Sequence, residues 1–245
     1  MKTNKIIITL IMAFMLLFVT GCKKEKDSIK SSNDLNNALN QTIEEYKTAQ
    51  SVNAKISLIS STTQNISVKY NIENEKISSL ATILTDSEGE VSVYVLDGIC
   101  YISRYNAPKE KYTATDDELK TIADSYKLDA YIEKALEIFN VQFFNVSTCE
   151  ETGDNVYKLT CDLDLLQVAD DIPDDEIIDA EAQVEKLKEM ESITLTLTLS
   201  DGKVSIFEGT FVKDGATSTI KIEFLGTNAS EISVPNASEY TEKAK

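Results

Sequence analysis

Four cysteines and a large excess of carboxylates are the side chains with the most chemical potential, and histidine is absent. The cysteines are Cys22, Cys100, Cys149 and Cys161, and 41 Asp plus Glu stand against 24 Lys plus Arg. Without an imidazole there can be no Ser-His or Cys-His nucleophilic pair and no zinc or haem site of the usual His-containing kinds. We therefore expect no catalytic residue, no metal site and no cofactor.

The acidic residues are densest between Asp170 and Glu181, around Pro173. Several carboxylate oxygens can bind Ca²⁺, although the alternating Asp-x-Asp-x-Asp-Gly loop of a dedicated site is missing. Acids at the start of a helix also interact favourably with its dipole, so a solvated helix start is the preferred interpretation and a cation site the alternative. The net charge of −17 and the single arginine, Arg104, argue against a nucleic-acid surface, because phosphate binding needs a basic patch.

Cys22 ends a segment with the layout of a secretory signal. Two lysines precede an apolar run over residues 6–19, in which Thr9 is the one polar residue. The run is too short for a transmembrane helix of about 20 apolar residues. The run closes with Val-Thr-Gly-Cys at residues 19–22, and this sequence resembles the lipobox of bacterial lipoproteins. The resemblance implies cleavage between Gly21 and Cys22 and a diacylglycerol on the Cys22 thiol.

The lipobox, the polar composition after it and the length of the remainder together predict three segments. Residues 1–21 are a lipoprotein signal peptide, residues 22–33 are the lipidated cysteine with a flexible polar tether, and residues 34–245 are a single domain with a sizeable core. The acyl chains would hold the domain on the extracytoplasmic face of a cell membrane, with the lipid bilayer as a partner. The Lys- and Asn-rich, Arg-poor composition fits an AT-rich Gram-positive genome. We expect the domain to be a monomer.

Cys149 and Cys161 flank a predicted turn over residues 152–155. They could face each other across a hairpin and form a disulfide. Free buried thiols are the preferred interpretation, because cysteine is often simply a small core residue.

The mature chain opens with a predicted amphipathic helix over residues 34–50, with Asp34 as its N-cap. Apolar and polar residues then alternate through five segments joined by short links, which predicts an antiparallel meander. These segments are residues 52–58, 66–72, 77–84, 91–95 and 99–104.

A helical insertion then interrupts the strands. Thr115 and Glu118 form a capping box before an apolar periodicity that runs to Tyr126. The elements predicted after it are a helix over residues 128–139, a hairpin about Gly153 from strands 141–149 and 156–161, helices over 163–169 and 177–190, and strands over 192–200, 203–213 and 216–225. Asp-Gly turns join the last three strands, which is a strong hairpin signal.

This order of elements resembles the LolA/LolB-like (LppX-like) half-barrel superfamily. Two local sequences are also similar: the strand, Asp-Gly turn and tyrosine over residues 93–101, and a short strand ending in proline over residues 232–235. The resemblance implies an α+β fold in which a curved antiparallel sheet of about ten strands, an open half-barrel, wraps around amphipathic helices. In that superfamily the concave face holds apolar ligands, and known carriers use an arginine latch that we do not match to Arg104.

The resemblance implies a membrane-anchored, non-catalytic binder or carrier of an apolar or lipid-like ligand. Tyrosine suits a cavity rim with one apolar and one wet side, although core packing explains each tyrosine singly. Two alternatives remain open, an acidic protein-interaction module at the cell surface and a carboxylate-based hydrolase. The residues expected around the ligand are Leu39, Ile43, Tyr46, Tyr94, Tyr101 and Tyr131.

Overall fold

The computed structural model describes residues 31–126, 143–168, 177–228 and 232–243. The chain divides into two units at Ser31, and all described residues belong to the second unit. The predicted signal peptide and Cys22 lie outside the described residues, as do the helix predicted over residues 128–139, with Tyr131, and most of the acidic stretch after Asp170. No helix in the described ranges is long and apolar enough to cross a membrane.

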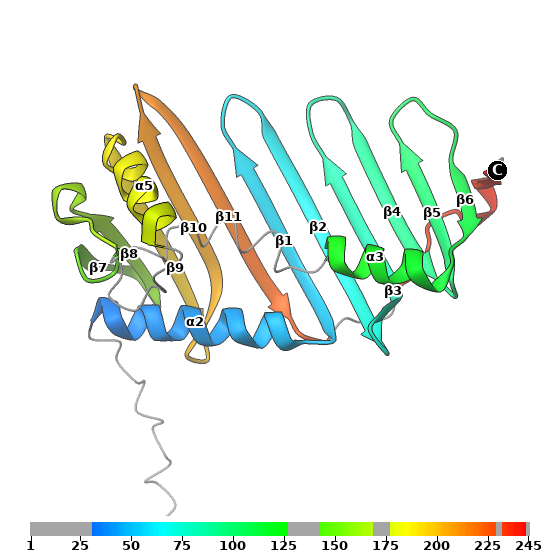
Figure 1. The fold of residues 1–245 in the computed structure, drawn as a ribbon, viewed down its shortest axis with the longest axis horizontal. Helices are drawn as coiled ribbons and strands as arrows, with labels where there is room; N and C mark the ends of the chain where they lie inside the picture. The colour runs from blue at the N-terminus through cyan, green and yellow to red at the C-terminus, as the bar shows by residue number, and fades with distance from the viewer. Residues whose placement is uncertain (1–30, 127–142, 169–176, 229–231, 244–245) are drawn as a thin grey trace, which may run out of the picture. The chain divides into compact units, whose positions relative to one another are not determined.

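Twelve strands form one open sheet, and helices lie on one of its faces (Figure 1). The strand order is β12-β6-β5-β4-β3-β2-β1-β11-β10-β9-β8-β7, and every neighbouring pair is antiparallel except β12 with β6. The strands are β1 Ser51–Ile59, β2 Thr63–Glu73, β3 Lys76–Thr85, β4 Glu90–Leu96, β5 Ile99–Arg104, β6 Glu110–Thr113, β7 Ser147–Gly153, β8 Val156–Cys161, β9 Ser192–Ser200, β10 Lys203–Lys213, β11 Ala216–Gly226 and β12 Thr241–Glu242.

The α-helices of the described residues are α2 Ser32–Thr48, α3 Asp116–Tyr126 and α5 Ile177–Lys188. These helices, the five-strand meander and the three closing strands confirm the corresponding predictions. The Asp-Gly hairpins are confirmed as well. Asp201 and Gly202 have φ of 53° and 80°, and Asp214 and Gly215 have φ of 51° and 72°. Two consecutive residues with positive φ match the right-handed twist of the flanking strands, which is why Asp-Gly is favoured there.

The two faces of the sheet differ in chemistry because side chains alternate along each strand. On β1, Val52, Ala54 and Ile56 are at most 2% exposed. Phe224 of β11 pairs with Ala54, and the ring of Tyr46 from α2 meets it edge-on at 4.9 Å. We call the side that α2 covers the helix-side face.

The other side is the open face. On β1 it carries Asn53, Lys55 and Ser57, and the paired positions on neighbouring strands are mainly Thr, Ser, Lys and Glu. β9 shows the same alternation: four buried apolar residues alternate with Thr194, Thr196 and Thr198, which lie on the open face. A sheet with one buried and one wet face is typical of antiparallel meanders.

Helix caps agree with the sequence at one helix and differ at the other. Thr115 and Glu118 form the predicted capping box at α3: the Thr115 N–H donates to the Glu118 carboxylate at 2.7 Å, and the Glu118 N–H donates to the Thr115 hydroxyl at 3.3 Å. Asp34 is not the N-cap of α2. Ser31 is, because its hydroxyl accepts from the Asp34 N–H at 3.3 Å, and the helix begins two residues earlier than predicted.

Several predicted boundaries are wrong. The strand predicted over residues 141–149 begins only at Ser147, because Phe143 and Phe144 are buried in a turn with their rings 5.8 Å apart. The helix predicted over residues 163–169 is a single 3-10 turn, η2 Leu163–Leu165, capped by the Asp162 carboxylate. Residues 232–234 form no strand, and the short C-terminal strand is β12 instead.

Candidate functional site

The structure does not bring the predicted ligand residues together. Leu39, Ile43 and Tyr46 lie on the buried side of α2 and are 1%, 4% and 4% exposed. Tyr94 and Tyr101 pair directly across β4 and β5, but they lie on the open face. Paired residues share a face, and the pairings that start at Phe224 on the helix-side face and pass through β1, β2 and β3 reach Val93 on β4. Adjacent residues of a strand point to opposite faces, so Tyr94, next to Val93, points to the open face.

One of the open-face tyrosines, Tyr101, contacts the C-terminal strap, which we define as residues 237–243. The ring of Tyr101 meets that of Tyr240 edge-on at 5.3 Å. The Lys109 ammonium lies 5.6 Å from the Tyr240 ring centre and 2.5 Å from the Glu239 carboxylate, and this hydrogen bond raises the pKa of Lys109. Tyr101 therefore packs against the chain's own C-terminal segment, and Tyr94, which pairs with Tyr101, lies beside this contact.

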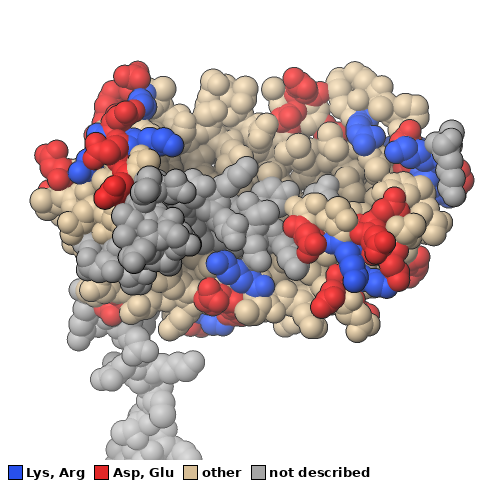
Figure 2. Space-filling model, in the orientation of Figure 1, with Lys and Arg blue, Asp and Glu red and all other residues tan. Residues whose placement is uncertain are grey.

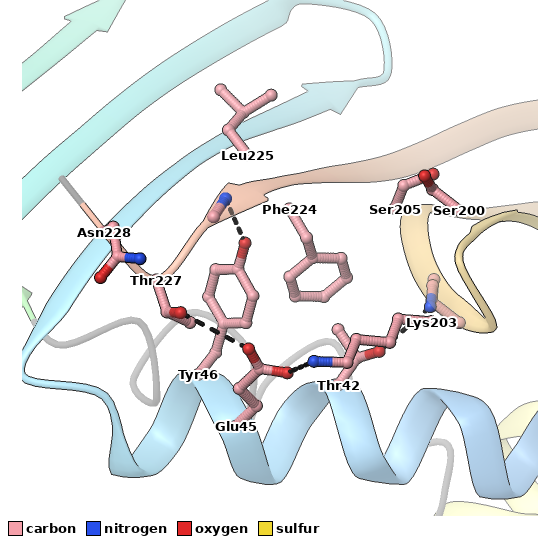
Figure 3. A pocket seen from close by; sticks show the side chains of 12 residues that line it. Thr42, Glu45, Tyr46, Ser200, Lys203, Ser205, Phe224, Leu225, Thr227 and Asn228 are labelled. Atoms are coloured by element: carbon pink, nitrogen blue, oxygen red, sulfur yellow. Dashed lines mark hydrogen bonds and ion pairs between the residues drawn. The ribbon is translucent and has the colours of Figure 1, made fainter. Parts of the chain in front are cut away.

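A hollow of about 410 Å³ lies where the C-terminal end of α2 meets β10 and β11 (Figure 3). Tyr46 and Phe224 point into it, together with the side chains of Glu45 and Lys203. The helical spacing of Tyr46 predicted its place at the site, but no local pattern predicted the two charged residues. Glu45 and Lys203 are 158 positions apart, and only the fold brings them together.

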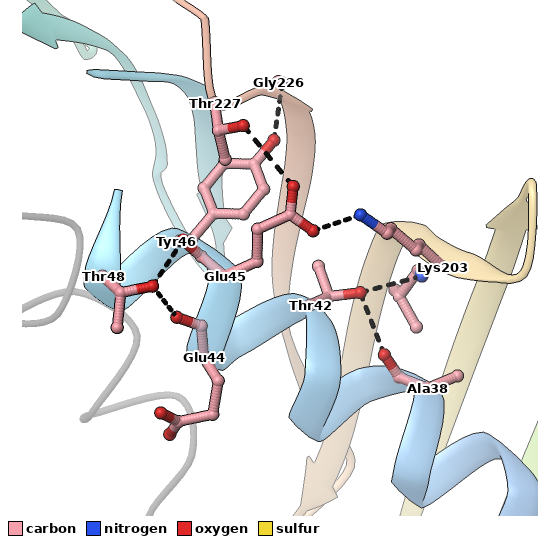
Figure 4. A network of polar contacts seen from close by, with 10 residues as sticks. Ala38, Thr42, Glu44, Glu45, Tyr46, Thr48, Lys203, Gly226 and Thr227 are labelled. Atoms are coloured by element: carbon pink, nitrogen blue, oxygen red, sulfur yellow. Dashed lines mark hydrogen bonds and ion pairs between the residues drawn. The ribbon is translucent and has the colours of Figure 1, made fainter. Parts of the chain in front are cut away.

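Paired polar groups fill the hollow's rim (Figure 4). The Glu45 carboxylate forms an ion pair with Lys203 and accepts from the Thr227 hydroxyl at 3.4 Å. The Gly226 N–H donates to the Tyr46 hydroxyl at 2.5 Å. Burial raises the pKa of Tyr46, so the phenol stays neutral in the physiological range. These contacts join α2 to the sheet at the rim of the hollow.

A second feature of the helix-side face is better suited to a ligand. Five apolar side chains, one on each of the neighbouring strands β11, β1, β2, β3 and β4, remain partly exposed, and Leu58 is 37% exposed. We call them the apolar strip. In Figure 2 the surface beneath the upper turns of this face is largely uncharged. The strip consists of Ile220, Leu58, Ile66, Leu84 and Val91.

The register makes the apolar strip continuous. Ile220 pairs with Leu58, Ile66 pairs with Leu84, and Leu84 pairs with Val91. Leu58 itself pairs with Gln64 on β2. Ile66 pairs with Ile56, two residues before Leu58, so the two halves of the strip meet diagonally beside Gln64. All five residues lie in segments that the sequence predicted to be strands. The sequence could not show that α2, which crosses the opposite ends of the strands in Figure 1, leaves them partly uncovered.

The three described cysteines are free thiols. Cys149 of β7 pairs with Leu159 and is exposed, whereas Cys161 of β8 pairs with Ser147 and is buried. The two cysteines are not directly opposite each other, and they form no disulfide. Burial raises the pKa of Cys161 to about 11.

Carboxylates give no sign of an acid-base or metal centre within the described ranges. No three Cys, Asp or Glu side chains there are grouped as metal ligands would be. Glu189 has a lowered pKa, caused by its hydrogen bond with Lys213 at 2.6 Å. That carboxylate is an ordinary partner in a surface ion pair.

No protein-family model and no curated protein matches the chain. Among solved structures, one match is the crystal structure of an uncharacterized conserved protein from Thermus thermophilus. The identity is 6%, the match covers 83% of this chain and 98% of the other, and the TM-score is 0.32. The likeness to the LolA/LolB-like superfamily thus stays a prediction from element order.

Proposed function

We propose that the chain is a membrane-anchored, extracytoplasmic lipoprotein that binds one apolar, lipid-like ligand and catalyses no reaction. Cys22 carries the anchor, and the following polar residues give the domain reach. The sheet curves around its helices as an open half-barrel, with the apolar strip on the floor of the ligand site. The apolar strip is the observation that supports this proposal best.

The strip favours binding because of its continuity. Single exposed apolar side chains are normal on a protein surface, whereas a contiguous patch marks a site for a ligand or partner. Covering such a patch stabilises a complex by about 25 cal/mol for each Å² of apolar surface removed from water. The strip crosses five adjacent strands and continues the buried core of the helix-side face.

A matched pair of neighbouring residues allows the ligand site to be tested. Leu58 and Ile59 are 37% and 43% exposed and point to opposite faces at the same end of β1. Binding of the neutral apolar dye Nile red is measured by fluorescence on the domain from residue 23 onward. Leu58→Glu is expected to weaken binding about tenfold, a change of about 1.4 kcal/mol, and Ile59→Glu to leave it within a factor of two.

Native mass spectrometry of the same domain supplies a second measurement. A bound lipid that co-purifies with the unaltered domain and with Ile59→Glu, but not with Leu58→Glu, supports the proposal. Equal dye binding by both variants, with no lipid on either, rejects a ligand site on the helix-side face.

The anchor is tested separately at Cys22. In cells fed a radiolabelled fatty acid, the unaltered chain is expected to take up label and to sediment with membranes. Cys22→Ser removes the only thiol in the lipobox and is expected to lose both properties, while Cys149→Ser keeps them. Label on the Cys22→Ser chain contradicts the assignment.

A second candidate function is an interaction module for a cationic partner. The first turn of α3 contains Asp116, Asp117 and Glu118, all exposed, and Figure 2 shows acidic groups gathered over this part of the face. Such a module predicts capture of a basic protein that is lost at high salt, with no lipid bound to the purified domain.

A further inference from the structure

The only arginine of the chain stands at one end of the apolar strip. Arg104 is the last residue of β5 and pairs directly with Val91, the last member of the strip. Directly paired residues point to the same side of a sheet, so Arg104 shares the helix-side face with the five apolar side chains. Its backbone position is fixed by the Ala107 N–H, which donates to the Arg104 carbonyl at 3.1 Å.

The Arg104 guanidinium is available to an incoming anion. Its side chain is 53% exposed, and the ion pair with Glu110 has a nitrogen-to-oxygen distance of 4.0 Å. That separation is longer than a hydrogen bond. A guanidinium has five N–H donors in a planar fork that fits a carboxylate or a phosphate with two parallel bonds.

The distance along the strip suits one extended chain. From Ile220 on β11 to Arg104 on β5 there are five steps between neighbouring strands, or about 24 Å at the usual strand spacing of about 4.8 Å. The apolar strip contributes one apolar side chain on each strand from β11 to β4, and Arg104 contributes a cation on β5. The strip and Arg104 together therefore match the polarity of an amphiphile with one apolar tail and one anionic head.

The charge of the protein makes this arginine selective. With a net charge of −17, the chain repels anions in general. An anionic head can settle on the helix-side face only where a local cation neutralises it. Arg104 supplies that cation at the rim, where the head also stays in contact with water.

We infer that the ligand of the helix-side face is a single-chain anionic lipid, with its tail along the apolar strip and its acidic head on Arg104. This inference rests on the proposed function and specifies its ligand class. A neutral lipid of the same length shares the tail contacts but lacks the contact with the guanidinium.

The test compares two probes of equal length, tetradecanoate and 1-tetradecanol, as competitors of Nile red on the domain from residue 23 onward. Tetradecanoate is expected to displace the dye at least about tenfold more strongly than the alcohol, since hydrogen bonds to charged groups are the strong ones. Arg104→Gln is expected to remove that preference and to leave the alcohol within a factor of two. Arg104→Lys keeps part of it, because one ammonium replaces the fork.

Lys55→Gln is the matched control, because Lys55 is an exposed cation on the open face and is expected to leave both probes unchanged. Displacement by acid and alcohol with equal strength in the unaltered domain overturns the inference and leaves the proposed function standing. An equal loss of both probes in Arg104→Gln also overturns it, since the residue is then only structural. If neither probe displaces the dye from the unaltered domain, the proposed function and the inference both fail.

Discussion

Thr42 fixes α2 to the sheet with one hydroxyl that forms two hydrogen bonds. The hydroxyl donates to the Ala38 carbonyl at 2.9 Å and accepts from the Val204 N–H at 3.1 Å, and the side chain is 2% exposed. The second bond joins the helix to the start of β10. A buried N–H that loses its acceptor destabilises the fold, because its desolvation is no longer offset by a hydrogen bond. A single oxygen atom therefore has a large effect on the docking of α2.

Thr42→Val keeps the shape of the side chain and removes the oxygen. We expect it to lower the free energy of unfolding by about 1–3 kcal/mol, because the Val204 N–H stays buried without its acceptor. Thr48→Val on the same helix removes an exposed hydroxyl that donates to the Glu44 carbonyl at 2.7 Å, and it should cost less than about 0.5 kcal/mol. Urea unfolding followed by circular dichroism measures both. Equal losses would show that the contact with Val204 adds nothing.

The cysteines differ in reactivity because the thiolate is the nucleophile. A pKa of about 11 for Cys161 leaves about one thousandth of that thiol ionised at pH 8. Cys149 is exposed and Cys100 is buried, and burial raises the pKa of both thiols. In the folded domain without Cys22, iodoacetamide at pH 8 should label Cys149 first.

Mass spectrometry of tryptic peptides measures the rate at each site. The rate at Cys161 should rise about tenfold per pH unit up to about 11, since ionisation limits it over that range. The folded state keeps this thiol protonated above the pKa of an unfolded thiol. The contribution of the protonated Cys161 thiol to the free energy of unfolding is thus complete below about pH 8.5 and declines as the pH rises toward 11. Fast labelling of Cys161 at pH 8 contradicts the buried assignment.

At the level of elements, Gly89 shows how a hairpin depends on one missing side chain. Gly89 precedes β4 with φ of 140°, and a Cβ there would lie 2.4 Å from Cγ of Tyr105. Gly98, in the turn between β4 and β5, also has positive φ (74°), but nothing lies within 4 Å of its Cβ position. The two glycines therefore differ in two ways: the φ of Gly89 lies farther from the left-handed helical region, and only a Cβ at Gly89 would overlap a neighbouring side chain.

Gly98→Ala should cost about 1 kcal/mol through backbone strain. Gly89→Ala should cost about 1–3 kcal/mol more, because its φ is less accessible to alanine and Tyr105 must also move. Differential scanning calorimetry at pH 7 measures the two changes. A melting temperature that falls equally in both variants would contradict the additional cost expected at Gly89.

The elements that the sequence predicted are those with purely local causes. Alternation gave the strands of the meander, Asp-Gly gave two closing hairpins, and Thr115 with Glu118 gave the start of α3. β6 was missed because its four residues, Glu110–Thr113, are half charged and show no clear alternation. β12 was missed because it exists only through pairing with β6, about 130 positions away.

The candidate site was less predictable than the fold. The sequence predicted Tyr94 and Tyr46 at one site because tyrosine suits a cavity rim, and Leu39 because its helix was expected to lie against the concave face. Which face each strand residue occupies depends on register across the whole sheet, however, and that register put Tyr94 on the open face. The polar partners of the hollow, Glu45 and Lys203, meet only after α2 docks.

Across the whole molecule, the two edges of the sheet are protected differently. At one edge the C-terminal strap pairs β12 with β6, and Tyr240 is 5% exposed. At the other edge β7 is largely exposed and contains Glu150 and Glu151. Charged residues on an edge strand discourage pairing with another chain. These protections agree with the expectation of a monomer, which stays a prediction.

Removal of residues 237–245 should uncover the β6 edge and the open-face side of Tyr101. We expect the shortened domain to self-associate at tens of micromolar, since an exposed edge is a template for strand pairing. Removal of residues 244–245 alone is the control and should not change the mass. Sedimentation velocity measures the oligomeric state. A shortened domain that stays monomeric at that concentration would show that the strap does not guard the edge.

The single ladder between β1 and β11 divides the sheet into two stretches of local pairing. β1 to β6 pair with sequence neighbours, and so do β7 to β11, but Ile56 must find Ile222 across more than half of the chain. Loop closure over that separation is slow compared with hairpin formation. The edge of β1 that faces away from β2 therefore stays unpaired during synthesis until β11 has been made. A chain with this order stays unable to complete its sheet until nearly all of it has been made, and chaperones that hold incomplete chains should bind at β1.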